Sequence, residues 1–177
     1  MDTVRAARKA RSGLIASATI SAIAVLAATG LFLGIARAQQ TFVALSAGAG
    51  APGASGHATI GLREGAAVGK VDVNGLPPQP FASGHFYGVW FVRTDGSKAF
   101  LGTLVNKESI IFSDGGNGHM EFSATQFTTG PAAGSPITFG AAGTNVIVVL
   151  IEHMVNGFTP SPVGPVPGTG VAVIGTF

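Results

Sequence analysis

The stretch from Gly13 to Ile35 contains no charged residue, and only a short basic tail, residues 1–12, precedes it. At roughly 20 residues, such an apolar run is long enough to cross the hydrocarbon core of a bilayer as a helix. A basic flank stays on the cytoplasmic side of a membrane. The run therefore predicts a cytoplasmic tail (1–12), an apolar transmembrane helix (13–35) and an exported part that begins at residue 39.

The same run also fits a secretory signal peptide. Ala36-Arg37-Ala38 follows it with the small-x-small pattern of a cleavage site before Gln39. The apolar core of a signal peptide usually has ~7–15 residues, which is shorter than this run. The run is nevertheless rich in Ala, Ser, Thr and Gly, and is therefore only moderately hydrophobic. Anchor and cleaved signal both stay open, and both export residues 39–177.

Charge differs on the two sides of this boundary. The chain has ten Lys and Arg residues against eight Asp and Glu residues, a net charge of +2. Residues 1–38 hold five of the basic residues and one acidic residue, so residues 39–177 hold five basic against seven acidic residues. The basic excess belongs to the tail, and the sequence predicts no nucleic-acid partner.

The exported part has the length of one ordinary domain. The chain contains no cysteine, which excludes a disulfide framework and a thiolate metal site. Glycine is frequent, at 27 residues, and only 10% of the residues are charged. This composition favours a β-rich domain with many tight turns.

Short apolar segments separated by turn residues run through the exported part. His57–Arg63 and Val68–Leu76 alternate apolar and polar residues, as strands with one buried face do, and Glu64-Gly65 between them predicts a tight turn. His85–Arg93 is the most aromatic run and is almost continuously apolar, which predicts a central strand buried on both faces. Asn145–Met154 is predicted as a second nearly continuous apolar strand. The other predicted strands are Thr41–Ser46, Lys98–Val105, Ser109–Ser113, His119–Thr125 and Gly170–Phe177. Eight or nine short strands of this kind predict an all-β, antiparallel β-sandwich.

Three stretches resemble the extracytoplasmic C-terminal domain of anti-sigma-K factor proteins. The first is FVALSAGAGAPGASGHATI (42–60), a short strand with a loop of small residues. The second is VDVNGLPPQPFASGHFYGVWFV (71–92), which resembles the family's strand, Gly-Leu-Pro-Pro, spacer and Tyr-x-hydrophobic-Trp. The third is VVLIEHMVNGFTPSPVGPV (148–166), which resembles the family's strand, Glu and Pro-rich segment. Together they cover essentially the whole exported part.

The resemblance implies an immunoglobulin-like sandwich that one helix tethers outside a bacterial plasma membrane. In that family, a cytoplasmic N-terminal domain holds a sigma factor inactive until regulated proteolysis releases it. Here only about a dozen residues precede the apolar run, too few for a folded domain. The spacer between membrane and first strand is also missing, because Thr41 follows Ile35 almost at once. Direct binding of a sigma factor is therefore not expected of this chain.

No motif of a known catalytic or cofactor site is present, so we predict a protein that is not an enzyme, with no catalytic, cofactor-binding or metal-binding residues. His119 and Glu121 project from one face of a predicted strand, and with His85 or His153 they offer a metal-binding alternative. We interpret these residues, and His57, as polar surface or edge positions. Glu152 and His153 point to opposite strand faces, which argues against a shared site.

Aromatic and proline residues admit two interpretations each. Phe86, Tyr87, Trp90 and Phe91 either line a ligand groove or belong to the core, and we favour the core. The proline segment 77–80 either presents a recognition surface or forms a rigid crossover between sheets, and we favour the crossover.

Two functions follow as expectations. The first is a non-enzymatic extracytoplasmic binding or sensing module of anti-sigma-factor type, held in the lipid bilayer by Gly13–Ile35. The second is a structural cell-envelope or matrix protein, secreted after cleavage following Ala38. Its partner is another envelope protein or a second copy, bound through strand edges.

Overall fold

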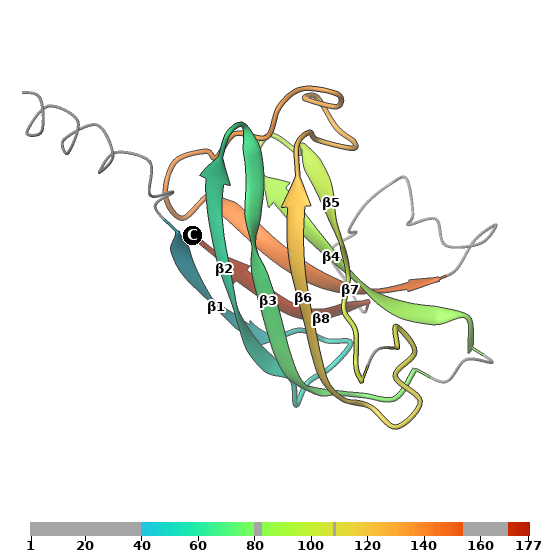
Figure 1. The fold of residues 1–177 in the computed structure, drawn as a ribbon. Helices are drawn as coiled ribbons and strands as arrows, with labels where there is room; N and C mark the ends of the chain where they lie inside the picture. The colour runs from blue at the N-terminus through green and yellow to red at the C-terminus, as the bar shows by residue number, and fades with distance from the viewer. Residues whose placement is uncertain (1–39, 80–82, 108, 154–169) are drawn as a thin grey trace, which may run out of the picture. The chain divides into compact units, whose positions relative to one another are not determined.

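The computed structural model describes residues 40–79, 83–107, 109–153 and 170–177, which belong to one compact unit, Ala38–Phe177 (Figure 1). The predicted helix 13–35 lies outside the described residues. So do Pro80, Met154 and most of the proline-rich segment before the last strand. The strands are β1 (Thr41–Ala47), β2 (Ser55–Arg63), β3 (Ala66–Leu76), β4 (His85–Arg93), β5 (Lys98–Thr103), β6 (Gly116–Ala124), β7 (Asn145–His153) and β8 (Val171–Thr176).

All eight strands form one antiparallel sheet in the order β5-β4-β7-β8-β1-β2-β3-β6, nearly closed into a barrel. Strand β1 joins the two halves, because Thr41–Leu45 pair with β2 while Ser46 and Ala47 pair with β8. The half made of β1, β2, β3 and β6 lies in front of the other half in Figure 1. The predicted all-β, antiparallel class is confirmed.

The free edges of the sheet meet at one point. Val105, just after β5, exchanges two backbone hydrogen bonds with His119 of β6, with N···O distances of 2.9 and 3.0 Å. Further along, the backbone N–H groups of Thr128 and Thr129, which follow β6, donate to the carbonyl of Lys98 at the start of β5. The polypeptide after β6 thus covers the seam between the two edges.

The predicted turn between β2 and β3 is confirmed. Glu64 and Gly65 have φ values of 52° and 81°, the left-handed conformation that a two-residue hairpin of the twisted type requires. Arg63 pairs with Ala66 across this turn. The tight turn fixes the register, and with it the alternation that buries Val71 and Val73.

The main core lies between the two halves. Inward-facing side chains of β1, β2 and β3 meet those of β4, β7 and β8, and all of these residues are almost fully buried: Val43, Leu45, Ala58, Ile60, Val71, Val73, Tyr87, Val89, Phe91, Ile147, Val149 and Val173. Phe127 and Ile137, from the long connection between β6 and β7, fill the core where the two edges meet.

The prediction of a strand at Ser109–Ser113 is wrong. This segment makes only single bridges, from Ser109 to Asn106 and from Phe112 to Gln79. Of its apolar residues only Phe112 is fully buried, edge-to-face against the Tyr87 ring at 5.0 Å. A single anchoring side chain does not require a ladder, so the segment forms a loop.

The segment around Pro77 and Pro78 crosses from β3 in one half to β4 in the other, as predicted. The Tyr87 hydroxyl donates a hydrogen bond of 2.7 Å to the carbonyl of Pro77, and Gln79 Nε2 donates to the Tyr87 oxygen at 3.3 Å. Burial raises the pKa of Tyr87. The crossover is therefore fastened to the core by the tyrosine.

In the segments that the structure describes, no helix has the length and apolar character needed to span a membrane.

Candidate functional site

The outward-facing side of β4, β7 and β8 is apolar and buried. Trp90, Val148, Leu150 and Val171 form a second hydrophobic cluster there, with exposed fractions of 1–8%. We call this surface, together with Phe100 of β5 and Glu152 of β7, the apolar wall. The Phe100 ring lies 5.1 Å from that of Trp90. The aromatic run of β4 therefore packs on both faces, and the core interpretation of these residues is confirmed.

A carboxylate is buried in the apolar wall. Glu152 is 5% exposed, and its Oε1 accepts a hydrogen bond of 2.8 Å from Trp90 Nε1. Gly88 makes room for it, because a Cβ at this position would lie 2.8 Å from Glu152 Cγ. This contact joins the second and third stretches of the family resemblance. The sequence does not predict it, because its two partners are 62 residues apart.

The outward-facing side of β1, β2, β3 and β6, which we call the polar wall, is exposed and charged. His57, Asp72 and His119 are register partners across β2, β3 and β6, and Lys70 and Glu121 are partners in the next row. His57 Nε2 lies 3.4 Å from Asp72 Oδ2, and Lys70 Nζ lies 3.9 Å from the same oxygen. As predicted, His119 and Glu121 share one exposed strand face.

The structure does not bring together the residues of the metal-binding alternative. His85 lies opposite His153 across β4 and β7, while His119 lies opposite Asp72 in the other half of the sheet. The side chain of His153 is outside the described part. Among the side chains that are described, no group of three His, Asp or Glu could hold a metal ion.

An exposed aromatic residue interrupts the polar wall. Phe42 on β1 is 66% exposed, the largest exposed fraction of any large apolar side chain in the described residues. Its ring stacks on His57, with 5.5 Å between centroids and an interplanar angle of 18°. The alternation of β1 accounts for this position, because Val43 and Leu45 face the core and Phe42 therefore faces outward.

A hollow of about 360 Å³ lies beside Phe42 on the same wall. The register pairs Phe42 with Thr59, one of the residues that line the hollow. Gly69 and Phe122 also line the hollow, and they are in close contact, since a Cβ at Gly69 would lie 2.9 Å from the Phe122 ring. The remaining lining residues are Gln40, Arg63, Val68, Lys70 and Glu121.

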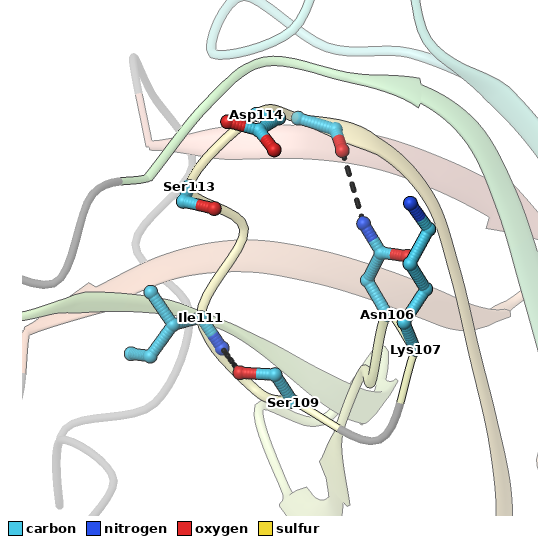
Figure 2. Close-up of a pocket in the computed structure, with 7 residues that line it drawn as sticks. Asn106, Lys107, Ser109, Ile111, Ser113 and Asp114 are labelled. Carbon is cyan, nitrogen blue, oxygen red and sulfur yellow. Dashed lines mark hydrogen bonds between the residues drawn. The ribbon is translucent and has the colours of Figure 1, made fainter.

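A second hollow, of about 320 Å³, lies in the loop between β5 and β6 (Figure 2). Asn106 Nδ2 donates a 3.0 Å hydrogen bond to the carbonyl of Gly115, and the backbone N–H of Ile111 donates to Ser109 Oγ at 3.0 Å. These two bonds help to shape the loop. Lys107 has a φ of 47°, and the turn in which Asn106 and Ser109 exchange backbone hydrogen bonds accounts for it.

These surfaces are suited to recognition. The His57–Asp72 pair is open to solvent, with side chains 39% and 37% exposed, and Asp72 also faces Lys70. Nucleophilic catalysis uses a nucleophile and a base held within hydrogen-bond reach, commonly in a site that excludes water, whereas the His57–Asp72 pair is exposed to solvent. Charged rows beside one exposed aromatic ring instead resemble the rim and anchor of a binding surface.

Fold and surface together define a small antiparallel all-β domain with one polar and one apolar outer wall. No protein-family model, no curated protein and no solved structure matches the chain.

Proposed function

We propose that this chain is a non-enzymatic binding or sensing module of anti-sigma-factor type, exposed outside a bacterial membrane. The observation that carries the proposal is the polar wall: one exposed aromatic ring, Phe42, among paired charges, beside a shallow hollow. Residues 39–177 have a slight excess of acidic residues, which counts against a nucleic-acid partner.

The strand connections support an immunoglobulin-like sandwich as the finer description of the fold. In that fold, strand B pairs with E in one sheet, and strand C pairs with F between neighbours C′ and G in the other. The pairs β3·β6 and β4·β7, with β5 and β8 outside the second pair, have this arrangement. Strand β1 is an addition that joins the two sheets.

The proposed anchor is the apolar helix 13–35, which would hold the domain at the outer face of the lipid bilayer. The alternative is a secreted structural protein of the cell envelope, and Ala36-Arg37-Ala38 is the observation that favours it. Assembly through strand edges finds less free backbone than an open sheet offers, because Val105 and His119 join the edges of β5 and β6.

The intact mass of the protein in its native host separates the two functions. The membrane fraction is washed with salt and carbonate, and both it and the medium are analysed. An anchored module is expected as the full-length chain in the washed membrane. Recovery of only a soluble species that begins at Gln39 would overturn the anchored module in favour of the secreted protein.

A further inference from the structure

One end of the domain carries exposed apolar and basic side chains. Strand β1 begins at this end, and the turn that joins β2 to β3 lies there too. The loop between β5 and β6 lies at the opposite end (Figure 1). This end carries Phe42, 66% exposed, and Leu62, 38% exposed. The Arg63 side chain at the end of β2 is 72% exposed.

We propose that this end rests on the lipid surface, with Phe42 inserted among the headgroups and Arg63 and Lys70 directed to lipid phosphates. The inference rests on the proposed function, because it requires that residues 13–35 stay in the membrane. It adds that the bilayer binds the domain itself as well as its anchor.

The length of the connection makes this contact possible. Four residues, 36–39, separate Ile35 from Gln40. Five extended steps of the backbone span at most about 18 Å. The headgroup layer on each side of a bilayer takes up about 5–8 Å of that distance. The start of β1 is therefore confined to the neighbourhood of the lipid interface.

The chemistry of these side chains suits an interface that is apolar on one side and wet on the other. An aromatic ring gains by leaving water at headgroup level, and the long stems of Lys and Arg lie along apolar groups while their charges stay hydrated. The Lys70 side chain is 53% exposed and lines the same hollow as Arg63. Both cations lie on the wall that carries Phe42.

The local charge indicates which lipids matter. Glu64, Asp72 and Glu121 accompany the two cations, so this end has no excess of positive charge. Long-range attraction to anionic lipids depends on such an excess. We therefore expect the contact to form equally in neutral phosphatidylcholine vesicles and in vesicles that contain phosphatidylglycerol.

Because the chain has no cysteine, single cysteines can be introduced and labelled without interference. The full-length chain is reconstituted in phosphatidylcholine vesicles with a fluorophore at Thr41→Cys, or at Ser113→Cys as the control at the far end. Some vesicles contain lipids with a nitroxide at the headgroup, which quenches nearby fluorophores. We expect the label at position 41 to lose emission and the label at position 113 to keep it.

A second pair of variants separates lipid contact from mere tethering. In the Thr41→Cys background, Phe42→Ser is expected to restore part of the emission, because the ring no longer holds the domain against the lipid. Ile174→Ser, which removes another exposed apolar side chain, 40% exposed, is the matched control and is expected to change nothing. Equal quenching at 41 and 113, or quenching unaffected by Phe42→Ser, would overturn the inference.

Flotation of the same vesicles distinguishes the two levels of the proposal. A chain that does not float with the lipid contradicts the anchor, and the inference falls with it. A chain that floats but whose label at position 41 fails the quenching test leaves the anchored module intact and removes the lipid contact alone.

Discussion

The apolar wall and the polar wall of the sheet differ in how deeply their side chains are buried. On the apolar wall, Trp90 and its neighbours are as buried as residues of the main core, and Glu152 accepts a hydrogen bond from the Trp90 indole. On the polar wall, the side chains of His57, Lys70 and Asp72 are 37–53% exposed, and Asp72 faces both of the others. The first wall therefore contributes stability, and the second leaves its groups available to a partner.

Among the variants compared, loss of the Trp90 side chain from the apolar wall should lower the free energy of unfolding most. Trp90→Ala is expected to lower the free energy of unfolding by about 3–5 kcal/mol, the usual cost of removing a buried aromatic side chain. Urea unfolding followed by circular dichroism measures it. Phe42→Ala on the polar wall is the control and should stay within about 0.5 kcal/mol. Similar losses for both variants would abolish the distinction between the walls.

The buried carboxylate sharpens the comparison further. Glu152→Ala leaves the indole N–H of Trp90 without its acceptor, which should cost about 1–3 kcal/mol of unfolding free energy. Glu152→Gln keeps an acceptor oxygen at the same position and should cost less. Asp72→Ala serves as the control on the polar wall, where its partners stay in water. If Glu152→Gln is as damaging as Glu152→Ala, the charge rather than the hydrogen bond stabilises the wall.

Tyr87 tests the core between the walls through its pH dependence. Burial raises the pKa of Tyr87 above its ordinary value of 10.0, because the phenolate is disfavoured in the core. The stability that this group contributes is fully present below pH 10.0 and is lost as the pH rises through the folded-state pKa. Urea titrations at increasing alkaline pH should therefore show a steeper decline for the parent chain than for Tyr87→Phe.

At neutral pH the same variant has a second effect. Tyr87→Phe removes the hydrogen bond to the Pro77 carbonyl and should cost about 0.5–1.5 kcal/mol. Identical alkaline profiles for the two proteins would mean that the hydroxyl does not remain protonated in the core.

The smallest effect is expected at an exposed ion pair outside both walls. The Arg93 guanidinium, hydrogen-bonded to Asp95, holds the pKa of that carboxyl well below its usual range. Its contribution is present above the ordinary Asp pKa and is lost as the pH falls toward the folded-state value. Asp95→Asn should therefore flatten the acid side of the stability profile while changing little at neutral pH. A steeper acid decline in the variant contradicts this.

The sequence predicts best the strands in which the order of apolar and polar residues matches the burial of their side chains. The continuous apolar run of β4 correctly predicted burial on both faces, and alternation in β3 correctly placed Val71 and Val73 inward. The failure at Ser109–Ser113 has the opposite cause: its apolar residues resemble a strand, but only Phe112 reaches the core.

Relations between distant segments could not be predicted from local pattern. Nothing in residues 41–47 indicates that β1 changes partner from β2 to β8, since both pairings satisfy the same alternation. The bond between Trp90 and Glu152 likewise depends on the register of β4 with β7. The outward position of Phe42, by contrast, follows from local pattern, because it alternates with the buried Val43 and Leu45.

The pairing of Ser46 with Ile174 joins the first strand of the domain to the last. In a chain that emerges N-terminus first, from a ribosome or an export channel, the sheet cannot be completed until residues 171–176 have emerged, because β8 pairs with both β1 and β7. Contacts between such distant parts of a chain form slowly and leave strand edges open meanwhile. The step that most exposes this protein to aggregation or proteolysis is therefore the arrival of its final strand.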